Sequence, residues 1–218
     1  KAVIEIAKCK SKVILCGVGK SGLIASKIAA TFSSLGLTSL FLNPLDALHG
    51  DLGIADKNDL ALVISNSGET KEIIEILPHL KKRGNTIISI TGNTSGFLAK
   101  QSDYLLSCFV EEEACPNNLA PTSSTTAQLA LGDALAISTM KFKKFGKLDF
   151  KKLHPSGSLG AQLKTVEDIM ITGKRIPFVN ENLLMNKALK IITEKKLGIL
   201  VVRNNNNITT GIITDGQI

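Results

Sequence analysis

Short apolar runs alternate with helix-like segments along most of the chain, and this alternation constrains the fold more than any other feature. The predicted strands are residues 13–17, 39–42, 60–65, 86–91 and 104–109. The predicted helices between and after them are residues 21–35, 72–82 and 125–143. Strands that are short, apolar on both faces and separated by helices indicate a parallel sheet covered on both sides. The sequence therefore predicts an α/β fold, a three-layer, doubly wound parallel five-stranded sheet.

The pattern changes after His154, which divides the predicted domains. We expect one domain over residues 1–160 and a small α+β unit over residues 165–218. The small unit is predicted to hold a helix over 184–195 and strands over 199–203 and 208–214. About 50 residues form a thin core, so we expect this unit to be incomplete and to pair with a second repeat or another chain.

Composition and charge exclude some classes of protein and leave others open. The chain has 218 residues and a net charge of +7. No apolar run approaches the roughly 18 residues of a membrane span. Positive charge suits nucleic acid, an anionic surface or a phosphorylated small molecule. The lysine-rich stretch 141–152 lacks a nucleic-acid-binding motif, and we interpret it as a solvated helix end and linker. The four cysteines form no C-x-x-C pair and favour free thiols in a reducing cytoplasm.

The loop after the first strand is glycine-rich, Gly17-Val18-Gly19-Lys20-Ser21-Gly22. It matches the dinucleotide pattern G-x-G-x-x-G, but the second strand ends in Asn43 rather than the carboxylate that a ribose requires. A Walker P-loop is also excluded, because Ile14 replaces its first glycine. Two interpretations remain, a tight turn without a ligand and an anion site built from Gly19, Lys20 and Ser21 at a helix N-terminus.

Two further segments are rich in hydroxyls where a strand gives way to a helix. The loop after the third strand is Ser65-Asn66-Ser67-Gly68-Glu69-Thr70, and the last predicted helix is preceded by Pro121-Thr122-Ser123-Ser124-Thr125-Thr126. Neutral donors and helix-terminal amides suit a phosphate. Glu69 would repel one, so it is expected either to face solvent or to serve a polar part of the ligand away from the phosphate. Three carboxylates, at residues 111–113, follow the fifth strand.

Taken together, these motifs resemble the sugar isomerase (SIS) domain of the D-arabinose 5-phosphate isomerases. Besides the three loops, the resemblance rests on Glu113-Ala114-Cys115-Pro116, His49-Gly50-Asp51-Leu52-Gly53 and His154-Pro155. It covers roughly residues 10–165. Within the small unit, residues 168–170 and 211–216 are similar to the first repeat of a CBS pair, of which that family normally carries two.

The resemblance implies an aldose–ketose isomerase and a set of site residues. Its catalytic positions correspond to Lys20, Glu69, Glu113 and His154. Its substrate-binding positions are expected at Gly19, Ser21, His49, Ser65, Ser67, Thr70, Ser123, Ser124 and Thr125. Isomerisation through an enediolate needs a base and groups that stabilise an oxyanion, and we assign Glu113 and Lys20 to these roles. His154 would move protons between oxygens and is a candidate to act in a neighbouring chain's site, while Glu69 would orient Lys20 or a hydroxyl.

The resemblance also sets expectations for cofactors, partners and location. No cofactor is expected, and no metal, since Asn43 stands where relatives often have a zinc-binding histidine. We expect a sugar phosphate as ligand, no nucleic acid or membrane, and a cytoplasmic homotetramer serving Kdo and lipopolysaccharide synthesis. Two alternatives stay open: a non-catalytic sugar-phosphate sensor, and an isomerase of another sugar phosphate.

Overall fold

The computed structural model describes residues 1–154 and 164–218, which fall into two compact units, Lys1–Leu163 and Lys164–Ile218. Over the described residues, no helix combines the length and the apolar character needed to cross a membrane.

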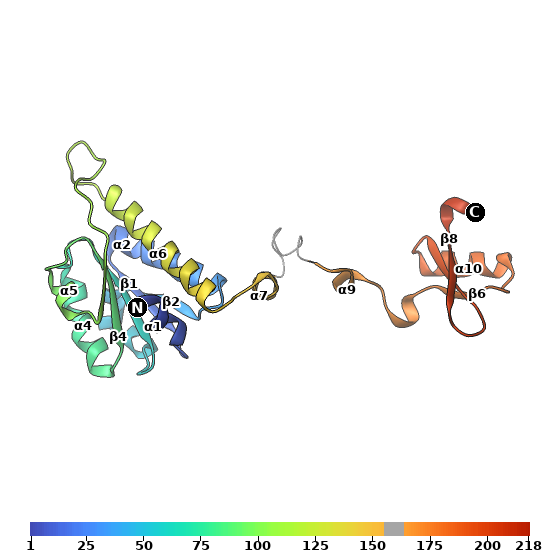
Figure 1. Cartoon of the computed structure of the whole chain (residues 1–218), viewed down its shortest axis with the longest axis horizontal. Helices are drawn as coiled ribbons and strands as arrows, with labels where there is room; N and C mark the ends of the chain where they lie inside the picture. Colours follow the sequence, from blue (N-terminus) through green and yellow to red (C-terminus); the bar gives the residue numbers. More distant parts are fainter. Residues whose placement is uncertain (155–163) are drawn as a thin grey trace. The chain divides into compact units, whose positions relative to one another are not determined.

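The first unit is built on a parallel five-stranded sheet (Figure 1). Its strands are β1 (Val13–Gly17), β2 (Ser39–Leu42), β3 (Leu60–Ile64), β4 (Thr86–Thr91) and β5 (Tyr104–Ser107). Their order is β2-β1-β3-β4-β5, and all four pairings are parallel. Every residue of β1 and β3 is buried, as the continuous apolar runs predict. The predicted fold class and all five predicted strands are confirmed.

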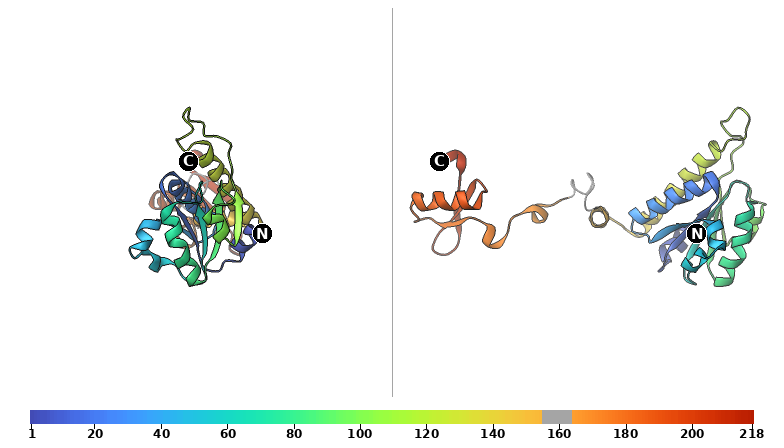
Figure 2. Two further views of the ribbon diagram at one scale, coloured as in Figure 1. Left: turned by 90° about the vertical axis from the view of Figure 1, so that its left-hand side faces the viewer. Right: turned by 180° about the vertical axis from the view of Figure 1, so that it is seen from behind.

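Helices cover both faces of this sheet, which Figure 2 shows from the side and from behind. On one face lie α1 (Ala2–Lys8), α2 (Gly19–Ser34) and α6 (Ser123–Phe142), which pack on the sheet through residues such as Ile6, Ile28 and Leu135. On the other lie α3 (Pro44–Leu48), α4 (Lys71–Arg83) and α5 (Phe97–Gln101), with Ile73 and Leu98 in their core. A short 3₁₀ helix, Asp51–Ile54, follows α3.

The lysine-rich stretch after α6 is more ordered than the sequence suggests. The predicted linker is wrong here, because Lys147–Leu153 form a further helix, α7. Asp149 accepts a hydrogen bond from the backbone amide of Gly146 and so caps the helix start. Phe150 packs on the α1–α2–α6 side of the core, which explains a phenylalanine among lysines.

The second unit is a small α+β arrangement. It contains α9 (Val166–Ile169), β6 (Phe178–Asn180), α10 (Met185–Lys195), β7 (Ile199–Arg203) and β8 (Thr209–Thr214), with 3₁₀ turns at Gly173–Arg175 and Asp215–Gln217. The strand order is β6-β7-β8, and β7 and β8 are antiparallel, joined by the asparagine run 204–207. Only Val179, Ala188 and Leu200 are buried hydrophobics in its core. The core is thin, and pairing of this unit with a second repeat or with another chain stays a prediction.

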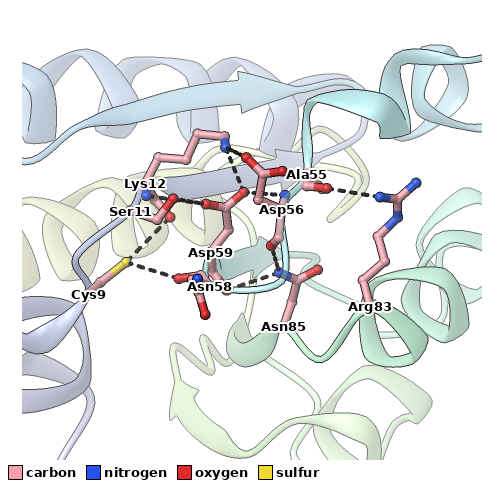
Figure 3. Close-up of polar contacts among 9 residues, drawn as sticks. All are labelled: Cys9, Ser11, Lys12, Ala55, Asp56, Asn58, Asp59, Arg83 and Asn85. Carbon is pink, nitrogen blue, oxygen red and sulfur yellow. Dashed lines mark hydrogen bonds and ion pairs between the residues drawn. The ribbon is translucent and has the colours of Figure 1, made fainter.

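A buried polar cluster fixes the amino ends of the strands (Figure 3). The Asp59 side chain is fully buried before β3 and lies 2.8 Å from the ammonium of Lys12, which precedes β1. It also accepts hydrogen bonds from the Ser11 hydroxyl and from the backbone amide of Asp56. Burial alone would raise the pKa of Asp59, but Lys12, Ser11 and the amides hold it below its usual value. The cluster therefore holds together the loops that precede β1 and β3.

Removing Lys12 should destabilise the first unit. Lys12→Met leaves the Asp59 carboxylate buried without its counter-charge, which costs about 3 kcal/mol of unfolding free energy at neutral pH. A depressed carboxyl pKa contributes stability above the unfolded value of about 4, and this contribution is lost as pH falls. Urea unfolding should therefore show the difference from wild type shrinking below pH 4.

An exposed ion pair provides the control for this experiment. Lys8 lies 3.8 Å from Glu5, and its side chain is 69% exposed. Lys8→Met should change the unfolding free energy by no more than about 0.5 kcal/mol. Equal effects of Lys12→Met and Lys8→Met would contradict the stabilising role assigned to the buried pair.

Candidate active site

The loop after β1 is shaped by a close crossing of strand and helix. A side chain on Gly22 would lie 2.7 Å from the carbonyl oxygen of Gly17, and one on Gly17 would lie 2.8 Å from the carbonyl oxygen of Ser21. Both glycines are therefore required for α2 to leave β1 at this angle. The close packing of strand and helix therefore accounts for these two glycines, and no bound nucleotide is needed to explain them. Lys20 and Ser21 then lie in the first turn of α2, at the carboxyl edge of the sheet.

The loop after β3 is held in one conformation by its own hydroxyls. The hydroxyls of Ser65 and Thr70 are 2.8 Å apart, and Ser65 also accepts a hydrogen bond from the amide of Gly68. Gly68 has φ of +67°, a left-handed conformation that favours glycine. Ser67 accepts a hydrogen bond from the amide of Glu69. The serines and threonine predicted to bind phosphate thus also stabilise the loop itself.

Glu69 has a structural partner that neither of its predicted roles included. Its carboxylate accepts a hydrogen bond of 2.7 Å from the backbone amide of Phe97, the first residue of α5. An acidic side chain at a helix start is favourable, because it satisfies an unpaired amide and complements the helix dipole. Through this oxygen, Oε1, Glu69 connects the loop after β3 to α5, and its predicted role toward a ligand stays a prediction.

Glu113 caps the start of α6. One carboxylate oxygen, Oε2, accepts hydrogen bonds from the amide of Thr122 at 2.7 Å, the hydroxyl of Thr122 at 3.1 Å and the amide of Ser124 at 3.1 Å. The backbone amide of Glu113 donates to the Asn118 side chain at 2.7 Å. Among residues 1–154 and 164–218, no hydrogen bond to the other oxygen, Oε1, is formed.

These contacts determine the ionisation of Glu113. The Ser124 side chain beside the carboxylate and the Thr122 amide make the largest contributions, and together the contacts lower the pKa of Glu113 to about 2. Glu113 is therefore an anion over the whole physiological range. A pKa this low makes Glu113 a weak base in this conformation, so the role of base that the sequence assigned to it must depend on permanent ionisation and on alignment with the carbon-bound proton.

A pocket of about 310 Å³ lies beside Glu113 and joins three of the loops. Ser21 from the first loop, Asn66 from the second, and Glu113 and Ser124 from the third are in its wall. Ser124 is 1% exposed, and its hydroxyl lies beside the Glu113 carboxylate, whose pKa it lowers.

The structure brings together only part of the predicted site. Ser21, Glu113 and Ser124 line the pocket, with Lys20 next to Ser21 and with Ser123 and Thr125 on either side of Ser124. Sequence reasoning missed Asn66 as a lining residue and Asn118 and Thr122 as partners of Glu113. All three lie in or beside the motifs named above. The sequence could therefore have pointed to these residues, although not to their contacts.

His154 lies far from this pocket within the chain. It follows α7, beyond the carboxyl end of α6, and α6 has 20 residues and is about 30 Å long (Figure 1). Its ring stacks on Phe150 with centroids 3.8 Å apart, and Nδ1 lies 2.9 Å from the Phe150 carbonyl oxygen. A carbonyl only accepts, so Nδ1 carries the proton and Nε2 of the neutral ring is an acceptor.

Asn43 and His49 flank the short helix α3, which follows β2. Asn43 is the N-cap of α3 and accepts a hydrogen bond from the amide of Leu45, and the exposed His49 ends that helix. Neither lines the pocket beside Glu113. Within the described ranges, no group of three or more histidine, cysteine, aspartate or glutamate side chains is placed to hold a metal ion.

The four cysteines are free, and burial raises the pKa of Cys16 to about 12.

Comparison with known families identifies the fold. The model of the SIS domain family matches residues 5–138, which is most of the first unit. The chain belongs to the SIS domain family. The match ends before the second unit, so the likeness of that unit to a CBS repeat stays a prediction.

Two curated relatives of this SIS domain protein are named arabinose 5-phosphate isomerase KdsD. The chain is 47% identical over 217 residues to the arabinose 5-phosphate isomerase KdsD of Francisella tularensis strain SCHU S4, and 46% identical over 211 residues to that of Escherichia coli K12. These alignments cover 99% and 96% of this chain but only 66% and 64% of the relatives. A solved Escherichia coli CFT073 protein in complex with arabinose 5-phosphate is 46% identical, with a TM-score of 0.68 over 70% of this chain and 81% of that one.

Proposed function

We propose that this protein interconverts D-arabinose 5-phosphate and D-ribulose 5-phosphate through an enediolate. The observation that carries the proposal is the pocket in which Ser21, Glu113 and Ser124 meet at the carboxyl edge of the sheet. Hydroxyls and helix-terminal amides suit a phosphate and sugar hydroxyls, and a carboxylate suits proton transfer. The names of the KdsD relatives and the ligand of the solved Escherichia coli CFT073 complex support this substrate.

In this mechanism, the Glu113 carboxylate takes the proton from C1 of the ketose or C2 of the aldose. It uses Oε1, since Oε2 is occupied by α6. Charge then develops on the carbonyl oxygen, and Lys20, at the start of α2, stabilises it. Ser65, Ser67 and Thr70 contribute to holding the phosphate, and Glu69 fixes the loop that carries them. His49 contacts the substrate, and His154 moves the proton between O1 and O2.

Because His154 lies about a helix length from Ser124 in its own chain, we infer that it acts in the site of a neighbouring chain. His154→Ala and Lys20→Ala chains should each be inactive alone. After subunit exchange, some hybrid sites combine an intact Lys20 with an intact His154, so part of the activity should return. No recovery under conditions in which exchange is demonstrated by mass spectrometry would contradict action between chains.

A substrate panel tests the proposed function. Pentose, hexose and heptose phosphates are each incubated with the protein, and the products are identified. We expect isomerisation of arabinose 5-phosphate with a kcat/KM at least roughly tenfold above that of any hexose or heptose phosphate, since a longer sugar must displace groups that contact the pentose. Binding without turnover of any of them would indicate a sensor, and preference for another sugar would indicate a different isomerase.

The wider setting follows from the resemblance. In this proposal, the product arabinose 5-phosphate is used in the synthesis of Kdo for lipopolysaccharide. The protein itself is proposed to be a cytoplasmic homotetramer. The observation that supports an assembly is the placement of His154, whose proposed role needs a second chain.

A further inference from the structure

We propose that Thr122 is a positioning residue that fixes the Glu113 carboxylate for proton transfer, by binding one of its oxygens and leaving the other for the substrate. This inference rests on the proposed function. Thr122 immediately precedes α6, nine residues after Glu113, and its side chain connects the two ends of the intervening loop.

The Thr122 hydroxyl contacts both the side chain of Glu113 and the backbone of the next residue, Ala114. It donates to Glu113 Oε2 at 3.1 Å and accepts a hydrogen bond from the amide of Ala114 at 2.9 Å. The Ala120 carbonyl, at 3.2 Å, competes for the single hydroxyl proton. The carboxylate is the closer and charged acceptor, so the proton is directed to Glu113. The hydroxyl thus ties the Glu113 side chain to the backbone that follows it.

Asn118 completes the support from within the loop. Its side-chain oxygen accepts from the Glu113 amide at 2.7 Å, and its own backbone amide donates to the carbonyl of Cys115 at 2.8 Å. Asn118 has φ of +52°, a left-handed conformation that asparagine tolerates better than most residues. The backbone of Glu113 is therefore fixed independently of its carboxylate.

Three donors bind Oε2 of Glu113 and so restrict rotation of the carboxylate. The direction in which the other oxygen, Oε1, points is therefore fixed as well. Alignment of a base with a carbon-bound proton accounts for a large part of the rate of such a step. The Ser124 side chain and the Thr122 amide make the largest contributions to the low pKa of Glu113, about 2, and the Thr122 hydroxyl makes the smallest, so its loss should raise the pKa only slightly.

Two substitutions separate positioning from folding. Thr122→Val keeps the shape and removes the hydroxyl, whereas Thr122→Ser keeps the hydroxyl. We expect Thr122→Val to lower kcat by about 10- to 100-fold with KM changed less than about twofold, and Thr122→Ser to restore most of kcat.

A measurement without substrate checks the contact directly. The ¹³C carboxyl resonance of Glu113, assigned with Glu113→Gln, is titrated in the wild type and in Thr122→Val. We expect its midpoint to rise in the variant. An unchanged kcat in Thr122→Val, or an equal loss in Thr122→Ser, would overturn the positioning role. Absence of turnover in the wild type would instead overturn the proposed function, while the titration would still report the contact.

Discussion

Glu113→Gln should lower kcat by about 10²- to 10⁴-fold, the usual contribution of a general base. Glutamine has the shape of glutamate, and its amide oxygen can still accept from the amides of Thr122 and Ser124. The start of α6 and the pocket should therefore remain folded. Substrate should still raise the melting temperature of the variant, because binding does not require the transferred proton.

The control for this variant carries the same change of charge away from the pocket. Glu75 lies on the surface of α4, 3.9 Å from Lys71. Glu75→Gln should leave kcat within about a factor of two, because surface substitutions of this kind have small effects. Near wild-type turnover in Glu113→Gln would remove Glu113 as the base.

Lys20→Met should lower kcat by about 10²- to 10³-fold, which is the typical cost of losing one group that stabilises an oxyanion. Lys20 is exposed in the first turn of α2, where the amides at the helix start add to its positive charge. Stabilisation that develops only in the transition state should be lost from kcat and kcat/KM alike, with little change in KM.

Lys71→Met is the matched control, since Lys71 also begins a helix at this edge of the sheet but pairs with Glu75. It should leave kcat within about a factor of two, as expected for an exposed ion pair. A Lys20→Met variant that raises KM and leaves kcat unchanged would assign Lys20 to ground-state binding of the phosphate instead.

The sheet could be predicted because its strands leave a strong local signal. Val13–Gly17 and Leu60–Ile64 are apolar at nearly every position, and a strand covered on both faces requires this. Short helices such as Pro44–Leu48 and Lys147–Leu153 were missed, because five to seven residues barely reach one or two helical turns. Their stability comes from packing, which sequence periodicity does not reveal.

The site was predictable as a set of motifs but not as a set of contacts. The placement of Ser21, Glu113 and Ser124 around one pocket follows from the rule that loops at the carboxyl edge converge. The bond from Glu69 to Phe97 and the cap formed by Glu113 depend on loop conformations that no spacing encodes. The stacking of His154 on Phe150 likewise depends on α7, which the sequence did not predict.

The central claim is isomerisation of a pentose phosphate through an enediolate, and one measurement tests it most directly. Ribulose 5-phosphate is incubated with the protein in D₂O, and the products are followed by NMR. The mechanism predicts arabinose 5-phosphate that carries deuterium at C2, because a base that exchanges with solvent delivers the proton there. Saturable binding of ribulose 5-phosphate without formation of any aldose would contradict it.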